Sequence, residues 1–176
     1  FIFQRTTSPE KAPNKPTLVT IKFKNGDPIG VNGKRLKPSM LFEKLNKLAG
    51  KNGIGRVDLV ENRFLGIKSR GVYETPGGTL LIHAHRAMES VTLDKETMHK
   101  KDNIMSRYAE LIYNGYWYSK ERFKLQKIVD HKKNKVNGSV KLKLYKGNIT
   151  IQSRITNSEA YSMEKVSFEE NKSFNK

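Results

Sequence analysis

The chain has 176 residues, of which 36% are apolar, and a formal net charge of +17 at pH 7. This length suffices for one domain with a hydrophobic core, or for one compact domain and an arm. The lack of cysteine excludes disulfides and thiolate metal sites, and no apolar run approaches the ~20 residues that span a bilayer. Because the N-terminus also lacks the pattern of a signal peptide, we expect a cytoplasmic protein.

The first part of the chain predicts a connector and then a β-hairpin. Residues 1–16 contain three prolines and few apolar side chains, which is typical of irregular structure. Residues 17–24 alternate between two faces, as in a half-buried strand. Asn25 and Gly26 favour a tight turn, so residues 28–31 are expected to pair back as the second strand.

A helix and two short strands are expected next. Pro38 suits the first position of a helix. The helix has the spacing of a buried face at Leu41, Leu45, Leu48 and Ala49. Residues 56–61 and 64–69 are predicted as strands, and the glycines and proline of the segment 71–78 predict a bend after them.

The remaining elements are three helices and a second hairpin. The first helix is expected from Thr79, and the second from Asp94, a good N-cap residue, to about Asn114. Ser119 is expected to cap the third helix, and the alternation within 140–151 predicts a hairpin. Because hairpins replace alternating βα units, the fold class is α+β, an antiparallel sheet built from hairpins with helices packed on it.

The positive charge has two interpretations. Residues 120–146 hold ten Lys or Arg residues and two acids, interleaved with apolar residues. We favour a solvated lysine-rich face, and a basic nucleic-acid-binding module is the alternative. Aromatic residues that could stack bases lie beside this stripe, but we favour packing between two helices for Tyr113, Tyr116, Trp117 and Tyr118.

Two residues between 60 and 78 are candidates for ligand binding. Glu61 ends a predicted strand, and it either pairs with Arg63 or Arg70 on the surface or meets a ligand ammonium group. Tyr73 lies in the predicted bend, where its hydroxyl could serve a polar partner.

Other chemistries have no support in the sequence. His83 and His85 are two positions apart on a predicted helix, which does not suit a zinc site, so no metal ligand is expected. The chain has no serine-hydrolase motif, and Gly77-Gly78 lacks the pattern of a phosphate-binding loop, so no nucleotide-binding residue is expected in this segment.

Several segments, taken together, resemble the argininosuccinate synthase family. They follow the family's order and cover most of the chain: QRTTSPEKAPNKP, NGK, LFEKLNKLAGKNGIGRVDLVENR, GIKSRGVYETPGG, AHRAMESVTLD, YAELIYNGYWYS and GSVKLKLYKGN. The resemblance implies the synthetase domain of a homotetrameric ligase. That enzyme joins citrulline to aspartate with ATP, through a citrullyl-adenylate. It also implies that Glu61 and Tyr73, twelve residues apart, contact citrulline.

The resemblance further implies how the chain is divided and what it lacks. Residues 1–16 correspond to a connector from a missing N-terminal nucleotide-binding domain, 17–155 to the citrulline-binding and multimerisation domain, and 156–176 to the start of a truncated C-terminal arm. ATP, with Mg²⁺, is expected to bind mainly to the missing domain. We therefore expect an inactive isolated chain. Its partners would be citrulline, aspartate, ATP, the missing domain and identical subunits; no membrane or nucleic acid is expected.

Overall fold

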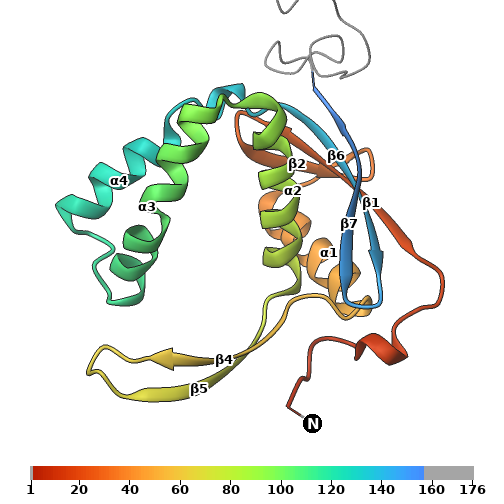
Figure 1. The fold of residues 1–176 in the computed structure, drawn as a ribbon. Coiled ribbons are helices and arrows are strands. Elements are labelled where there is room, and N and C mark those ends of the chain that lie inside the picture. Colours follow the sequence, from red (N-terminus) through yellow and green to blue (C-terminus); the bar gives the residue numbers. More distant parts are fainter. Residues whose placement is uncertain (1, 157–176) are drawn as a thin grey trace, which may run out of the picture.

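The computed structural model describes residues 2–156 and has an α+β fold (Figure 1). The strands and helices are, in chain order, β1 (Thr17–Lys24), β2 (Asp27–Val31), β3 (Lys34–Arg35), α1 (Pro38–Lys51), β4 (Arg56–Asn62), β5 (Lys68–Glu74), α2 (Pro76–Thr92), α3 (Lys95–Tyr113), α4 (Lys120–Asp130), β6 (Gly138–Tyr145) and β7 (Asn148–Ile155). Short 3-10 helices lie at Pro9–Lys11 and Lys133–Lys135. Every strand pair among these residues is antiparallel, so the predicted fold class is confirmed.

The core lies between a five-stranded sheet and two helices. The sheet has the order β3-β2-β1-β6-β7, and α1 and α2 pack against one face of it (Figure 1). Ile21 of β1 lies opposite Val31 on one side and Val140 on the other, and all three side chains are buried. The alternation that predicted these strands therefore reflects one buried and one exposed face.

Both core helices begin at a proline. Pro38 is the first residue of α1, as predicted, and Leu41 and Leu45 are buried. The helix after the β4–β5 segment was expected to begin at Thr79, but α2 already begins at Pro76. The physical reason is that proline fits the first helical turn, where its missing N–H needs no partner.

The β4–β5 hairpin differs from the prediction in its second strand. We expected a strand at 64–69 and a bend around Tyr73, but β5 runs from Lys68 to Glu74 and includes Tyr73. The turn between the two strands lies inside the predicted second strand, where the amide of Gly66 donates to the carbonyl of Arg63 at 2.8 Å. Gly66 has a φ of +78°, a conformation that glycine adopts without strain, so the apolar residues beside it form an exposed turn.

The helices α3 and α4 form an antiparallel pair that extends from the body on the same side as the β4–β5 hairpin (Figure 1). Both predicted N-caps are confirmed: Asp94 accepts the amide of Thr97 at 2.9 Å, and Ser119 accepts that of Arg122 at 3.2 Å. The predicted packing of the aromatic cluster is wrong. Its side chains are about half exposed or more because the pair buries few residues, and the guanidinium of Arg122 stacks on Trp117 instead.

The two ends of the chain differ in what can be described. Residues 2–16 are irregular apart from the 3-10 helix, as the prolines predict. The predicted C-terminal arm, 156–176, lies outside the described residues except for Thr156. The domain assignments from the family resemblance therefore stay predictions.

Candidate functional site

The β4–β5 hairpin brings Glu61 and Tyr73 onto one face. In the register of the hairpin, Glu61 lies opposite Ser69, Leu59 opposite Gly71, and Val57 opposite Tyr73. Because side chains alternate along a strand, these six residues share a face. The sequence predicted the two candidate residues but not their common strand pairing.

Gly71 provides the space in which the two candidates meet. A Cβ atom at this position would lie 2.6 Å from the Cε2 atom of the Tyr73 ring and 3.0 Å from Oε1 of Glu61. Both distances are too short for a side chain to be accommodated without movement. The carboxylate and the phenol therefore lie over the same point of the backbone, which explains a glycine in the interior of this strand.

The carboxylate of Glu61 is largely buried but incompletely satisfied. Its side chain is 13% exposed, and Oε2 lies 2.8 Å from Nη1 of Arg63. This contact is an ion pair without hydrogen-bond geometry. Among residues 2–156, Oε2 is the one buried side-chain nitrogen or oxygen atom that has no hydrogen-bond partner. Since buried polar atoms are nearly always hydrogen-bonded, this oxygen has capacity for a further donor.

Arg63 is held by two further groups that the sequence did not indicate. Its Nε donates to Oγ of Ser69 at 2.6 Å, and its Nη1 donates to the hydroxyl of Tyr113 at 3.3 Å. The hydrogen bond with Tyr113 and the charge of Glu61 raise the pKa of Arg63. Ser69 could have been found from the correct hairpin register, whereas nothing local points to Tyr113, fifty residues away on α3.

Tyr73 interacts with the same carboxylate. A hydrogen bond to Glu61, together with burial and the negative charge, raises the pKa of Tyr73, so the phenol keeps its proton at neutral pH. The predicted pairing of Glu61 with Arg63 is thus present, while Arg70 instead binds Asp58 through two hydrogen bonds of 2.9 and 2.6 Å.

This arrangement suits binding rather than bond making or breaking. An ionised carboxylate can accept from an ammonium group, and a protonated phenol can donate or accept one hydrogen bond. The serine on this face, Ser69, lies opposite Glu61 and accepts a hydrogen bond from Nε of Arg63 at 2.6 Å. The chemistry available here is therefore recognition of a polar ligand.

The base of the hairpin is fixed by the N-terminal segment. The carboxylate of Glu74 accepts the amides of Gln4, Arg5 and Thr6 at 2.7 to 3.0 Å, and also the hydroxyl of Thr6 at 2.5 Å. Burial acts to raise the pKa of Glu74, but the Thr6 hydroxyl and these amides outweigh it and lower the pKa to about 2. Glu74 thus anchors the connector to the strand that carries Tyr73.

Within the described residues, the start of α2 and the possible metal ligands bear on phosphate and metal binding. The amide of Gly77, at the start of α2, already donates to Oδ1 of Asn46 at 2.8 Å. No group of three or more His, Asp or Glu residues in the described part of the chain is arranged to hold a metal ion.

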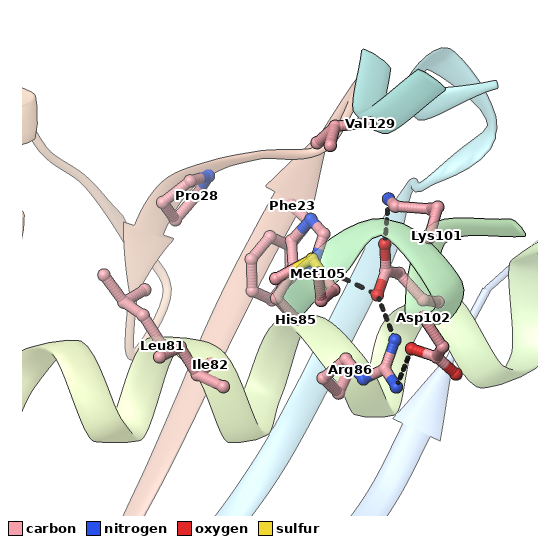
Figure 2. Close-up of a pocket in the computed structure, with 11 residues that line it drawn as sticks. Phe23, Pro28, Leu81, Ile82, His85, Arg86, Lys101, Asp102, Met105 and Val129 are labelled. Atoms are coloured by element: carbon pink, nitrogen blue, oxygen red, sulfur yellow. Dashed lines mark hydrogen bonds and ion pairs between the residues drawn. The ribbon is translucent and has the colours of Figure 1, made fainter. Parts of the chain in front are cut away.

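A separate cavity of about 590 Å³ lies between α2, α3 and the β1–β2 hairpin. Figure 2 shows its apolar side, formed by Phe23, Leu81, Ile82 and Met105 among others, and a cluster of charged side chains at one end. None of the residues that line it belongs to β4 or β5. The cavity is therefore distinct from the face that carries Glu61 and Tyr73.

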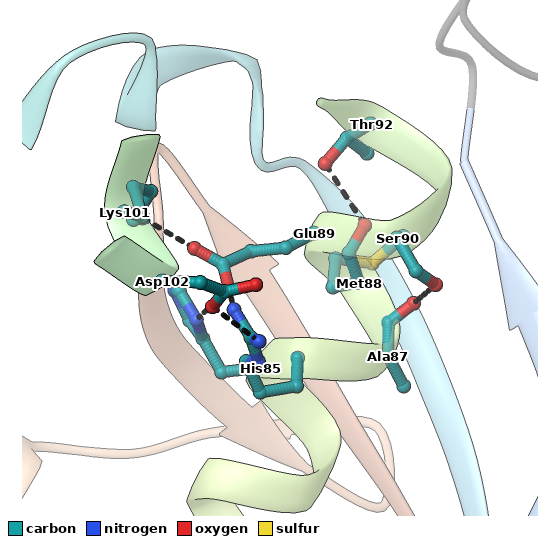
Figure 3. Close-up of polar contacts among 9 residues, drawn as sticks. His85, Ala87, Met88, Glu89, Ser90, Thr92, Lys101 and Asp102 are labelled. Carbon is teal, nitrogen blue, oxygen red and sulfur yellow. Dashed lines mark hydrogen bonds and ion pairs between the residues drawn. The ribbon is translucent and has the colours of Figure 1, made fainter. Parts of the chain in front are cut away.

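The charged groups beside this cavity satisfy one another (Figure 3). Glu89, with its side chain 3% exposed, binds Lys101 and lies 3.6 Å from both His85 and Arg86. Burial acts to raise the pKa of Glu89, but His85 and Lys101 outweigh it and lower the pKa to about 2. Arg86 also binds Asp102 at 2.6 Å. These contacts join α2 to α3 and leave no unpaired charge for a ligand.

The comparisons with known proteins all point to one family. The family described as "Arginosuccinate synthase C-terminal domain" matches residues 1–176. An argininosuccinate synthase of Pelagibacter ubique is 83% identical over 176 residues, which are all of this chain and 45% of that protein. Those of Granulibacter bethesdensis and Rhodospirillum centenum are 57% and 56% identical, over 96% and 99% of this chain and 41% and 43% of their own lengths.

The chain therefore spans less than half the length of these relatives. Within residues 2–156, no helix has the length and apolar character needed to cross a membrane.

Proposed function

The chain belongs to the argininosuccinate synthase family, and we propose that it works as part of a complete enzyme that ligates citrulline to aspartate with ATP. In this reaction the ureido oxygen of citrulline attacks the α-phosphorus of ATP and pyrophosphate leaves. The amine of aspartate then attacks the ureido carbon of the citrullyl-adenylate, and AMP leaves with the bonding electrons. The product is argininosuccinate, and the enzyme is an ATP-dependent ligase of arginine biosynthesis.

The contribution of this chain is to hold citrulline. Glu61 accepts hydrogen bonds from the α-ammonium group, and Tyr73 exchanges one hydrogen bond with the bound amino acid. The observation that carries this assignment is the buried Oε2 of Glu61, which has no hydrogen-bond partner among residues 2–156. An ammonium group has three donors and a positive charge, which suit such an oxygen. Holding the substrate in a reactive geometry accelerates the reaction without a chemical step on either residue.

The other requirements of the reaction are assigned to parts outside this chain. ATP and its Mg²⁺ are assigned mainly to an N-terminal nucleotide-binding domain, as the family resemblance implies. Residues 1–16 connect to that domain, 17–155 form the synthetase domain, and 156–176 begin a C-terminal arm. The enzyme is a cytoplasmic homotetramer, and the isolated chain has no ligase activity.

The test compares matched variants of the full-length protein that contains this chain. Citrulline-dependent pyrophosphate release from ATP and aspartate-dependent formation of argininosuccinate are measured for the wild type, Glu61→Gln and Tyr73→Phe. Glu43→Gln and Tyr145→Phe are the controls, because Glu43 pairs with Lys47 on the surface and Tyr145 is exposed. We expect Glu61→Gln to raise the citrulline KM at least about tenfold, as for loss of a charged hydrogen bond.

Two results would contradict the proposal. Folded full-length protein without pyrophosphate release would exclude the ligase activity. A citrulline KM that is the same in Glu61→Gln and in the control Glu43→Gln would exclude the assigned role of Glu61 while leaving the activity intact.

A further inference from the structure

We propose that Tyr113 and Ser69 are positioning residues. They hold Arg63 beside Glu61 and prevent its guanidinium from forming hydrogen bonds to the carboxylate. Arg63 then balances the charge of Glu61 and leaves Oε2 able to accept a hydrogen bond from the substrate. The inference rests on the proposed role of Glu61 in citrulline binding and adds to it the groups that set the state of that carboxylate.

The hairpin itself provides the comparison that reveals this arrangement. Arg70 and Asp58, which also pair between β4 and β5, form two hydrogen bonds, from Nε to Oδ1 at 2.9 Å and from Nη2 to Oδ2 at 2.6 Å. This is the two-pronged geometry that an unrestrained arginine adopts with a carboxylate. Arg63 approaches Glu61 as closely, at 2.8 Å, but makes no hydrogen bond to it.

The difference follows from what else each guanidinium binds. Nε of Arg63 donates a hydrogen bond to Oγ of Ser69 at 2.6 Å, and Nη1 donates one to the hydroxyl of Tyr113 at 3.3 Å. The five N–H donors of arginine lie in a rigid plane, so fixing two of them fixes the direction of the others. The guanidinium is therefore turned away from the geometry in which it would saturate Glu61.

The position of Tyr113 makes the site depend on a second element. Tyr113 is the last residue of α3, whereas Glu61, Arg63 and Ser69 all belong to the β4–β5 hairpin or its turn. If the phenol hydroxyl is removed, Nη1 loses the partner that competes with Glu61. Arg63 is then free to hydrogen-bond the carboxylate, and the substrate ammonium must displace it.

The experiment measures the citrulline KM of the full-length protein, with the citrulline Kd from calorimetry for variants of low turnover. Tyr113→Phe is expected to raise both about threefold to tenfold, the effect of one hydrogen bond, while the KM values for ATP and aspartate stay unchanged. Ser69→Ala is expected to act in the same direction, and Ser69→Thr, which keeps the hydroxyl, to restore the wild-type value. Tyr118→Phe is the control, since Tyr118 is 84% exposed on the following turn.

The effect must also depend on Arg63. In an Arg63→Met background, where no guanidinium can close on Glu61, Tyr113→Phe is expected to leave citrulline binding unchanged. A role of Tyr113 in packing alone would instead lower binding equally in both backgrounds. That result, or a Tyr113→Phe variant that binds citrulline like the wild type, would overturn the inference. Failure of Glu61→Gln to weaken citrulline binding would overturn the proposed role of Glu61 instead.

Discussion

The buried ion pair between Glu89 and Lys101 is expected to govern how firmly α3 is attached to α2. Lys101→Met removes the charge that approaches Glu89 most closely and leaves the carboxylate buried with His85 and Arg86, each 3.6 Å away. Breaking a buried pair on one side is more destabilising than replacing both partners, because the remaining charge keeps its desolvation cost. The variant should therefore unfold more easily than the wild type.

The magnitude can be worked from the ionisation of Glu89. Holding its pKa at about 2 instead of 4.5 corresponds to about 3 kcal/mol of stabilisation, at about 1.4 kcal/mol for each tenfold change in the equilibrium. His85 and Arg86 keep part of this, so we expect Lys101→Met to lose about 2 kcal/mol of unfolding free energy. Glu89→Gln in the same chain removes the stranded charge and should recover most of the loss.

The assay is urea unfolding, followed by far-UV circular dichroism and by the fluorescence of Trp117, the one tryptophan of the chain, which lies beside α3. Lys100→Met is the matched control, because Lys100 pairs with Glu96 on the surface and its loss should change little. Because the folded pKa of Glu89 is lowered, its contribution is complete above pH 4.5 and declines as the pH falls toward 2. The gap between wild type and variant should shrink over that range.

Unfolding of Lys101→Met at the same urea concentration as Lys100→Met at neutral pH would refute this role of the ion pair. A double variant, Glu89→Gln with Lys101→Met, that is less stable than Lys101→Met would refute it equally. The first result would mean that the pair contributes no net stability, and the second that Glu89 is stabilised without its lysine.

Three further variants test other contacts. Glu74→Gln should lower the unfolding free energy by about 1 kcal/mol, after allowing for solvent screening. Because the pKa of Glu74 in the folded protein is about 2, the urea midpoints of wild type and variant should converge as the pH falls from about 4.5 toward 2. Gly71→Ala would place a methyl group 2.6 Å from the Tyr73 ring. The full-length variant should therefore bind citrulline at least about tenfold more weakly while keeping its circular dichroism spectrum. An unchanged citrulline affinity by calorimetry would contradict this prediction. Leu80→Ala, at a fully buried position, should cost about 2–5 kcal/mol by urea unfolding, and a cost below about 1 kcal/mol would mean that the core there is loosely packed.

Much of the fold could be predicted because its signals are local. Alternation placed Ile21 in a strand with a buried face, and the capping residues Asp94 and Ser119 marked the starts of α3 and α4. These features depend on neighbours within a few residues, where geometry is fixed by the period of the strand or helix. The same locality explains why the family's segments, and with them Glu61 and Tyr73, could be recognised in order.

The state of the candidate site was decided only by tertiary structure. The sequence placed the second strand too early, at 64–69 instead of Lys68–Glu74, because a hairpin that projects from the body has no buried face to specify its register. Gly71 was expected in a bend but lies within β5, whereas the turn is at Gly66, inside the predicted strand. Contacts such as Arg63 with Tyr113 and Glu89 with Lys101 join separate elements. They exist only once packing has brought those elements together. No pattern along the chain could therefore reveal which charges are paired, or that Oε2 of Glu61 lacks a hydrogen-bond partner among residues 2–156.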